Sequence, residues 1–516
     1  MSQRHNRIDL FDTRRRRHYK RRRNWGQIFA RGLTFAVVIG ALVGGFLLFR
    51  AVTAPNVVQL RVLGADGVPL AGATIVSPNG TKATTADGGF AALAFDAPAM
   101  ISVNAPGYHP ANYDVQAIPL QGPLSLQMEA NILQGRVTDS AGIGLPGATV
   151  SLGGVTATSA DFGSFEIVAA EPGTITISKA AWDTTEVTWG GEEGRLDIQL
   201  DPFMVKGIRV YAPVAGDDAQ FEALLRLADT TPVNTLVFDT KSEGGEVLYD
   251  TKVPEAIAAG AVASEYEVEE RLAAAKAHGL YTITRIVAFQ DHYRSQLRPE
   301  LAIHEADGSV WTNSNGLAWM DITNEATWQY PIDLGVEACR LGFDEIQYDY
   351  ARFPTDGDLS QIVYSMGDVD AATRVSTVAA FLTEAQRQIH EEGCAVSADI
   401  FAIVLSVNDD QGLGQKVEEL SWAVDAISPM IYPSHYSNGW LNFDNPNDHP
   451  AAVVGQALDA GMPRLEGGAL MRPWLQAFSW SADQVQASIL AAESSGSGWM
   501  LWNALSQFEQ AYIPDE

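Results

Sequence analysis

The C-terminal two-thirds of the chain alternates short apolar runs with longer amphipathic stretches. From residue 201 onward, eight runs rich in β-branched and aromatic residues are separated by helical patterns. These candidate strands cover residues 207–211, 235–240, 281–288, 345–350, 395–400, 426–431, 469–472 and 498–502. Helices are predicted between them, for example over 264–278, 371–390 and 450–460. Strands that alternate with helices are typical of a parallel sheet built from βα units.

Eight such strands in about 310 residues fit an α/β domain of the (β/α)₈ or TIM-barrel type with inserted loops. A doubly wound sheet is the alternative, but no glycine-rich phosphate loop follows the first strand. We therefore predict a TIM barrel over residues 203–516.

Residues 57–200 follow another pattern, with brief Val, Ile, Thr and Leu runs broken by Gly, Asp and Pro. They contain an internal repeat with an offset near 75 residues: the segments RV, LAGAT and TTADGGF of the first copy match RV, LPGAT and TSADFGSF of the second. Short strands and tight turns predict two small all-β sandwich domains, over 57–129 and 130–202.

Both copies resemble the carboxypeptidase regulatory-like, or transthyretin-like, module. The matching features are the turn-and-strand motif around LAGAT and LPGAT and the later TADGGF-type motif. The resemblance allows contact with carbohydrate or with a partner, but no catalytic constellation occurs in this region. We therefore expect a spacer that lifts the barrel away from a membrane.

The first 50 residues combine a basic run with an apolar run. Twelve Lys and Arg residues stand against two acids here, and residues 32–49 read GLTFAVVIGALVGGFLLF. About eighteen uncharged residues are just enough to cross a bilayer core as a helix. A cleavable signal peptide is the alternative, but Pro55 disfavours cleavage after the small residues before it. We expect a basic cytoplasmic segment over 1–31, a transmembrane signal anchor over 32–50, and an extracytoplasmic remainder.

Charge and cysteine content narrow the choice of partners. The net charge is −29, and since residues 1–50 contribute about +10, the rest of the chain carries about −39. This acidity argues against nucleic acid as a partner and fits a neutral substrate or a cationic polymer better. The two cysteines, Cys339 and Cys394, cannot form a disulfide scaffold or a zinc site. Two buried free thiols are the expectation, and one bridge in an oxidising compartment is the alternative.

Polar and aromatic residues near the predicted strand ends are the candidates for chemistry, because TIM barrels carry their active sites at the C-terminal ends of the strands. The candidates are Asp239, Lys241, Arg285, Asp291, Asp349, Arg352, Asp399, Tyr432, His435, Arg472, Trp474 and Trp502. Aromatic residues are also numerous near the strand ends, and as a set around one rim they favour carbohydrate, since sugar rings stack on aromatic faces; for any single one of them, packing in the core is the expectation. The set is Tyr350, Tyr432, Tyr436, Trp440, Trp474, Trp499 and Trp502.

The fourth strand shows which of its side chains face the barrel interior. Its period-2 pattern places Glu345, Gln347 and Asp349 on one face and Ile346 and Tyr348 on the other. The apolar face should meet the helices, so the acidic face points inward, with Asp349 nearest the open end. A carboxylate inside a barrel is costly unless it is paired, and we expect the deeper Glu345 to form a salt bridge.

Five ordered segments between about 205 and 511 carry a second resemblance: NTLVFDTKSEGGEVLYD, GFDEIQYDYARFP, ISPMIYPSHY, MRPWLQAF and GWMLWNA. They are similar to a bacterial family of glycosyl hydrolases whose barrel is distantly related to the α-amylase group. The resemblance implies that Asp349 occupies the position of the nucleophile and that Asp399 is the nearest match to the acid/base. Gln347 departs from the α-amylase pattern, which has an arginine two residues before the nucleophile.

Glycosidic hydrolysis uses one ionised and one protonated carboxyl group. Asp349 is assigned as nucleophile or charge stabiliser and Asp399 as general acid, with Asp291 in reserve. The alternatives are a substrate-binding or ion-pair role for Asp349 and a hydrogen-bonded interior position for Asp399. Glu345 is expected to pair with Arg285 or Lys241.

Lys241, Arg285 and Arg472 are expected to orient substrate hydroxyls or to hold the carboxylates ionised. The other predicted substrate-binding residues are Asp239, Arg352, Tyr432, His435, Trp474 and Trp502. No cofactor is expected. No metal is expected either, because His292, His304 and His435 lack metal-ligand spacing.

The leading hypothesis is a membrane-anchored glycosidase or transglycosidase that acts on an extracellular or cell-envelope polysaccharide. A non-catalytic carbohydrate-binding barrel and a structural envelope protein are the alternatives, because a fold does not guarantee a reaction.

Overall fold

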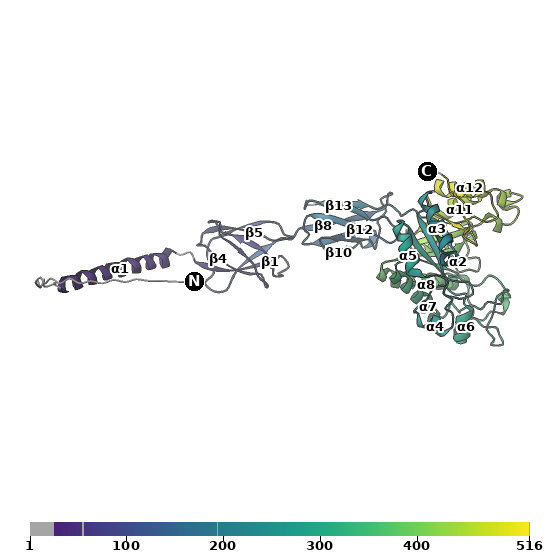
Figure 1. Ribbon diagram of the computed structural model, residues 1–516, viewed down its shortest axis with the longest axis horizontal. Coiled ribbons are helices and arrows are strands. Elements are labelled where there is room, and N and C mark those ends of the chain that lie inside the picture. Colours follow the sequence, from purple (N-terminus) through teal and green to yellow (C-terminus); the bar gives the residue numbers. More distant parts are fainter. Residues whose placement is uncertain (1–24, 54–55, 193, 515–516) are drawn as a thin grey trace, which may run out of the picture. The chain divides into compact units, whose positions relative to one another are not determined.

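The computed structural model describes residues 25–53, 56–192 and 194–514, and within the first helix it describes side chains only for residues 33–48. The chain divides into two compact units, residues 1–131 and 132–516 (Figure 1). The predicted cytoplasmic segment 1–31 lies outside the residues whose side chains are described.

Helix α1 spans Trp25–Thr53 and includes the apolar run. Among the described residues, no helix has the length and apolar character that crossing a membrane requires. That finding gives the predicted anchor over 32–50 no support.

The rest of the first unit forms two sheets, the first mixed and the second antiparallel. One has the order β4-β1-β7 and the other β3-β2-β5-β6. The strands are β1 Val57–Gly64, β2 Thr74–Val76, β3 Lys82–Thr84, β4 Phe90–Ala94, β5 Ala99–Asn104, β6 Ala111–Val115 and β7 Leu124–Met128. Alternate residues along β1 and β5 are buried, and both sheets contribute to one core that includes Leu60, Val62 and Ile101.

The second unit begins with the same strand order, β11-β8-β14 and β10-β9-β12-β13. Its strands are β8 Ile132–Thr138, β9 Thr149–Leu152, β10 Val155–Thr158, β11 Ser164–Val168, β12 Gly173–Ser178, β13 Thr185–Trp189 and β14 Arg195–Gln199. The resemblance of these domains to the carboxypeptidase regulatory-like module stays a prediction.

A buried hydroxyl explains why the LAGAT and TTADGG segments recur together. In the first copy, Thr85 Oγ1 donates to Leu70 O at 2.6 Å and accepts from Ala73 N at 2.9 Å. In the second copy, Ser159 Oγ makes the matching bonds to Leu145 O and Ala148 N, at 2.6 and 2.8 Å. Each hydroxyl satisfies buried backbone groups of a turn that cannot pair within a sheet.

The remaining strands form a closed parallel barrel. Their order is β19-β18-β17-β16-β15-β23-β22-β20-β21, and β19 also pairs with β20, which closes the ring. The strands are β15 Lys206–Val210, β16 Thr235–Lys241, β17 Tyr281–Val287, β18 Glu345–Asp349, β19 Ala395–Phe401, β20 Ala426–Ile431, β21 Leu470–Met471, β22 Trp474–Gln476 and β23 Trp499–Trp502. The predicted TIM barrel is confirmed.

Helices surround this barrel (Figure 1). They are α2 Ala212–Gly216, α3 Asp218–Asp229, α4 Pro254–Ala258, α5 Val268–Ala277, α6 His292–Leu297, α7 Gln329–Leu341, α8 Ala371–Glu392, α9 Ile403–Ser406, α10 Val417–Leu420, α11 Pro450–Gly461 and α12 Ala482–Ser494. The predicted helices over 371–390 and 450–460 match α8 and α11. The helix predicted to begin at residue 264 begins four residues later, at Val268 in α5.

The seventh strand differs most from its prediction, which ended at residue 472. It consists of β21 and β22, which flank Pro473 and pair in turn with β20. Proline has no N–H group to give to the ladder, so the pairing is interrupted there and resumes at Trp474. Residue 472 therefore lies in the lower part of the barrel and not at its mouth.

The fourth strand, β18, is buried on both faces as predicted. Ile346 and Tyr348 belong to the core between barrel and helices, where the Tyr348 hydroxyl donates to Pro331 O of α7 at 3.0 Å. On the inner face, the Gln347 amide donates to Ser428 Oγ at 3.1 Å across the barrel. Asp349 ends the strand on the same inner face, at the end where the loops of the mouth begin.

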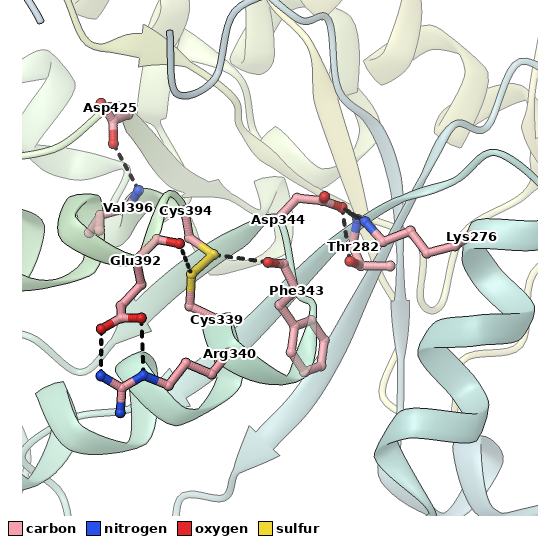
Figure 2. Close-up of a disulfide and its surroundings, with 10 residues drawn as sticks. All are labelled: Lys276, Thr282, Cys339, Arg340, Phe343, Asp344, Glu392, Cys394, Val396 and Asp425. Atoms are coloured by element: carbon pink, nitrogen blue, oxygen red, sulfur yellow. Dashed lines mark hydrogen bonds and ion pairs between the residues drawn. A yellow bond between two sulfur atoms is a disulfide. The ribbon is translucent and has the colours of Figure 1, made fainter. Parts of the chain in front are cut away.

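A disulfide joins Cys339 near the end of α7 to Cys394, the residue before β19 (Figure 2). The expectation of two free thiols is therefore wrong, and the single bridge is the correct alternative. Helix α7 and strand β19 bring the two residues together. Because the cysteines are 55 positions apart, the sequence alone does not reveal this proximity. The bridge lies at the N-terminal ends of the strands, opposite the mouth.

Candidate functional site

Arg285 on β17 is the hub of the barrel mouth. Its guanidinium lies 2.6 Å from Asp349 Oδ2, 2.6 Å from Glu243 Oε1 and 3.4 Å from Asp239 Oδ1, and its Nε lies 3.9 Å from Asp399 Oδ2. Burial disfavours its charge, but these four carboxylates outweigh burial and raise the pKa of Arg285 well above its ordinary value. One buried cation therefore organises four acidic side chains.

Asp349 is fixed from two sides. Its Oδ2 accepts from Nε and Nη2 of Arg285 at 3.0 and 2.6 Å, and its Oδ1 accepts from the backbone N–H of Tyr350 at 2.7 Å. These charge-assisted hydrogen bonds stabilise the ionised carboxylate. Tyr350 itself has φ +52°, in the left-handed region. Such backbone strain costs on the order of 1–3 kcal/mol and clusters at functional sites.

Asp399 on β19 has the opposite environment. Only 1% of its surface is exposed, and its Oδ1 accepts a 2.8 Å hydrogen bond from Trp474 Nε1. Burial, and then the negative charge of Asp349, raise the pKa of Asp399 well above its ordinary value, against the opposing effect of Arg285. Asp399 is thus the carboxyl group of the mouth that favours the protonated form.

The separation of the two carboxyl groups follows from Arg285, whose Nε lies 3.0 Å from Asp349 Oδ2 and 3.9 Å from Asp399 Oδ2. Two atoms at these distances from one nitrogen are at most about 7 Å apart, which covers the spacing of retaining glycosidases and the short end of that of inverting ones. Asp349 and Asp399 were predicted to lie together at the mouth of the barrel, and the structure places them together.

Glu243 is a third carboxylate that sequence reasoning did not single out. It lies in the turn after β16, about 41% of its side chain is exposed, and Arg285 Nη2 donates to it. The charge of Arg285 lowers the pKa of Glu243 to about 2. The signal in the sequence was an acid followed by two glycines directly after a strand end. The direction of the Glu243 side chain depends on the geometry of the turn, which the hydrophobic periodicity of the sequence does not reveal.

The turn that carries Glu243 is held by several hydrogen bonds. The Ser242 hydroxyl accepts from the backbone N–H groups of Gly244 and Glu246 at 3.1 and 3.2 Å and contacts the Glu246 carboxylate. The Gln290 side-chain amide donates to Glu243 O at 2.7 Å. The exposed carboxylate is therefore presented by a defined backbone.

Asp239, predicted to bind substrate, is enclosed by two arginines. Arg209 on β15 donates to both of its carboxylate oxygens, and Arg285 approaches Oδ1. The guanidinium carbons of Arg209 and Arg285 lie 4.1 and 5.0 Å from the centre of the Trp502 ring. Trp502 also meets Trp474 edge to face at 5.4 Å. The two tryptophans thus pack together against the charged group.

Lys241 and Asp291 lie outside this group. Both are fully buried, and they form an ion pair with Nζ 3.0 Å from Oδ2. The register of β16 shifts between residues 239 and 241, so that Lys241 pairs with Ile286 and faces away from the barrel interior. Such a bulge moves a side chain to the other face of the sheet. Burial lowers the pKa of Lys241, although Asp291 opposes this effect.

Arg472 also lies away from the mouth. It is 1% exposed and forms an ion pair with Glu345 near the N-terminal end of the barrel, where the Tyr281 hydroxyl donates to Glu345 at 3.1 Å. The predicted pairing of Glu345 with Arg285 or Lys241 is wrong, because the split seventh strand places Arg472 at the level where β18 begins.

Arg352, Tyr432 and His435 lie on the rim. The Arg352 guanidinium lies 4.6 Å from the Tyr350 ring centre and 5.3 Å from that of Trp319. Tyr432 meets His435 edge to face at 5.3 Å, and burial lowers the pKa of that histidine. Among the described residues, no group of three or more His, Cys, Asp or Glu side chains is arranged to hold a metal ion.

A cavity of about 240 Å³ opens beside this group. It is lined mainly by polar and aromatic side chains, among them Glu243, Gln290, Asn313, Trp319, Tyr350 and Arg352. An ionised carboxylate, a carboxyl group that favours its proton, and a neighbouring polar and aromatic hollow are together suited to binding a polar ring and to acid/base chemistry on it.

A family model described as "Putative glycosyl hydrolase domain" matches residues 207–508. No curated protein matches the chain.

Solved structures with a similar fold have low overall similarity to the chain. A hypothetical protein from Ruminiclostridium thermocellum ATCC 27405 is 31% identical, over 37% of this chain and 96% of its own, with a TM-score of 0.35. An alpha-amylase from Lactobacillus plantarum is 18% identical over 58% and 71%, with a TM-score of 0.40. The catalytic domain of a beta-amylase from Paenibacillus polymyxa is 11% identical over 60% and 96%, with a TM-score of 0.41.

Proposed function

Because the chain belongs to the family described as "Putative glycosyl hydrolase domain", matched over residues 207–508, we propose that it is a glycosidase that hydrolyses or transfers O-glycosyl bonds of an extracellular or cell-envelope polysaccharide. The observation that carries this proposal is the pairing of two carboxyl groups with opposite environments. Asp349 accepts two hydrogen bonds from Arg285, whereas Asp399 is enclosed and favours its proton. Such a division between two acids is what glycosidic hydrolysis needs.

In the proposed reaction, Asp349 attacks the anomeric carbon, or stabilises its positive charge while water attacks, as the bond to the leaving sugar breaks and Asp399 gives its proton to the oxygen of that sugar. Where Asp349 has attacked, water or an acceptor hydroxyl then displaces it and returns a proton to Asp399. The Arg285 guanidinium holds Asp349 in place through two hydrogen bonds. Trp474 orients Asp399 through its indole N–H. We expect the sugar to approach from the side of Asp349, because Tyr350, the next residue, lines the neighbouring cavity.

The low exposure of both carboxyl groups is also the observation that favours a second function, a carbohydrate-binding barrel without catalysis. In that case the buried charges serve to hold the mouth together, and the exposed Glu243 and the rim aromatics would bind the sugar. A fold of this kind hosts both outcomes.

One experiment separates the two. The full chain and its Asp349→Asn variant are incubated with a panel of polysaccharides, and new reducing ends and binding are both measured. We expect turnover by the wild type and a loss of at least about 1,000-fold in the variant, with binding retained. Equal binding by both proteins and no product from either would instead establish the binding function. Asp459→Asn, an exposed carboxylate on α11, is the matched control.

We also propose that residues 57–516 lie outside the membrane and that the basic run and the apolar segment 32–50 hold the N-terminus inside. Two features support this placement: the order of the basic and apolar runs, and the disulfide, which persists in oxidising compartments. Protease added to intact cells should degrade the barrel and leave a cytoplasmic marker protein whole. Protection of the barrel until the cells are lysed would contradict this location.

A further inference from the structure

The cavity of about 240 Å³ lies directly beside the charged group but is not part of it. Glu243 connects the two, since it lines the cavity and also accepts from Arg285 at 2.6 Å. Tyr350 lines the cavity and follows Asp349 in the chain. A ligand in this hollow would therefore be adjacent to the carboxylate that is the proposed nucleophile.

The volume and the wall indicate what kind of molecule fits. A cavity of about 240 Å³ that is partly open to solvent is large enough to hold one sugar ring. Trp319 and Tyr350 lie with their ring centres 5.7 Å apart on one part of the wall. The side-chain amides of Gln290 and Asn313 line it as well. Flat aromatic faces combined with amide donors and acceptors suit a hydroxyl-bearing ring.

The wall is held in shape before any ligand binds. Asn313 Oδ1 accepts from the backbone N–H groups of Asn315 and Leu317, both at 3.0 Å, and the Ser314 hydroxyl donates to Asp356 at 2.6 Å. Gln290 joins this loop to the Glu243 turn, since it accepts from Asn313 at 3.3 Å. A preformed wall reduces the entropy that binding would otherwise cost.

Two donors of the wall residues have no hydrogen-bond partner among the described residues. They are Nε1 of Trp319 and Nε of Arg352. Trp319 is 3% exposed and Arg352 is 6% exposed. A buried donor without a partner is costly, and such groups are rare in folded proteins. Both atoms are covered by neighbouring protein atoms, so a ligand acceptor would reach them only after a small shift of the wall.

The charges of the wall decide between sugar classes. Glu243 and Asp356 would repel a uronate or a sulfated sugar while Arg352 would attract it, and a free ammonium group would meet the opposite pair of effects. An uncharged ring avoids both repulsions, and its hydroxyl groups can donate to the two carboxylates and accept from Arg352. We infer that this cavity is a subsite for one neutral pyranose unit of the substrate, next to the bond that is cleaved; the inference rests on the proposed function.

The subsite is tested by filling it from its exposed edge. Asn315 lines the cavity and is an exposed turn residue that precedes a glycine, so Asn315→Trp should block the space without touching Asp349, Arg285 or Asp399. Asn438 is also exposed and precedes a glycine, but it does not line the cavity, which makes Asn438→Trp the matched control. Trp319→Phe, which keeps a ring and removes the unpartnered N–H, is the second variant.

Binding to the full chain is measured by calorimetry with neutral gluco-, galacto- and manno-tetraoses, oligogalacturonate and glucosamine tetramer. We expect at least one neutral tetraose to bind, with a Kd raised more than tenfold in Asn315→Trp, about three- to tenfold in Trp319→Phe, and less than twofold in Asn438→Trp. Tighter binding of a charged oligomer, no binding of any neutral one, or equal affinity in all variants would overturn the inference.

The two proposals fail separately. Neutral tetraose that binds in an Asn315-dependent way without any hydrolysis would leave the subsite intact and refute the glycosidase. Hydrolysis that continues in Asn315→Trp with an unchanged KM would refute the subsite and leave the glycosidase intact.

Discussion

Two nitrogens of Arg285, Nε and Nη2, donate hydrogen bonds to one carboxylate oxygen of Asp349, at 3.0 and 2.6 Å. The same guanidinium approaches Asp399 only to 3.9 Å. The positive charge of Arg285 therefore lies closer to Asp349 than to Asp399. Burial of Asp399, and then the negative charge of Asp349, raise the pKa of Asp399, and the more distant Arg285 opposes this effect.

The first prediction concerns the cost of this arrangement. Because the folded pKa of Asp399 is raised, the folded state binds more protons than the unfolded state between the unfolded and folded pKa values, and stability falls as pH rises through that window. Asp399→Asn removes this penalty, which amounts to about 1.4 kcal/mol for each unit by which the pKa is raised. We expect the variant to melt higher than wild type at pH 7 and to lose at least about 100-fold in activity.

Thermal melts of both proteins at pH 4 and pH 7 provide the measurement, with Asp459→Asn as an exposed control. Near pH 4 the difference between wild type and Asp399→Asn should shrink, because this pH lies close to the ordinary pKa of an aspartate and the penalty develops only as pH rises above it. A variant that melts lower than wild type at pH 7 would show that Asp399 stabilises the fold as a charged group.

The second prediction concerns Trp474, whose indole N–H donates to Asp399 at 2.8 Å and lowers the pKa of that carboxyl. Trp474→Phe removes the bond, so the pKa of Asp399 should rise further. If Asp399 is the general acid, activity falls as pH rises through its pKa, and the alkaline limb of kcat/KM should move to higher pH in this variant.

A matched control exists on the next strand. Trp499 is also fully buried, and its indole N–H donates to Glu493 at 3.1 Å, away from the mouth. Trp499→Phe should lower stability by a similar amount, yet leave the alkaline limb where it is in the wild type. Coincident pH profiles of the two variants would remove Asp399 from the proton transfer.

The strand pattern predicted most of the fold, because period-2 and 3.6-residue patterns record which face of each element is buried. Seven barrel strands lie within two residues of their predicted bounds. The eighth failed at Pro473, where the absence of an N–H group splits the strand and the ladder resumes beyond it. That local effect moved Arg472 from the predicted mouth to the lower barrel.

The site was less predictable, because it depends on features without a period. A one-residue register shift in β16 turns Lys241 away from the interior. Arg209, which pairs with Asp239, was missed because its strand looked apolar apart from this residue. Glu243 depends on a turn whose shape is set by hydrogen bonds of Ser242. Pairing of strand ends could be predicted, but the direction of loop side chains could not.

The third prediction tests that turn. Gly245 has φ +105°, and a Cβ atom there would lie 2.5 Å from Asp291 Oδ1. Gly245→Ala should therefore displace the turn, move Glu243 away from Arg285, and lower both stability and activity. Gly260 also has a positive φ, +66°, but no atom lies within 4 Å of its added Cβ.

Gly260→Ala thus reports the backbone cost alone, which is roughly 1 kcal/mol for alanine in this region. We expect Gly245→Ala to lose more stability than Gly260→Ala in urea unfolding, and to lose at least tenfold in kcat/KM where the control stays within about twofold. Equal effects of the two substitutions would mean that the position of the turn does not matter to the site.

The last prediction concerns the disulfide between Cys339 and Cys394. It closes a loop across 55 positions, and the chain-entropy model assigns such a cross-link about 4 kcal/mol of stability. Reductant should lower the urea midpoint of the wild type and leave that of a Cys339→Ala/Cys394→Ala variant unchanged. Because the bridge lies at the N-terminal ends of the strands, activity of the folded, reduced protein should equal that of the oxidised one. A midpoint that does not respond to reductant would mean that the two sulfur atoms are not joined in the native protein.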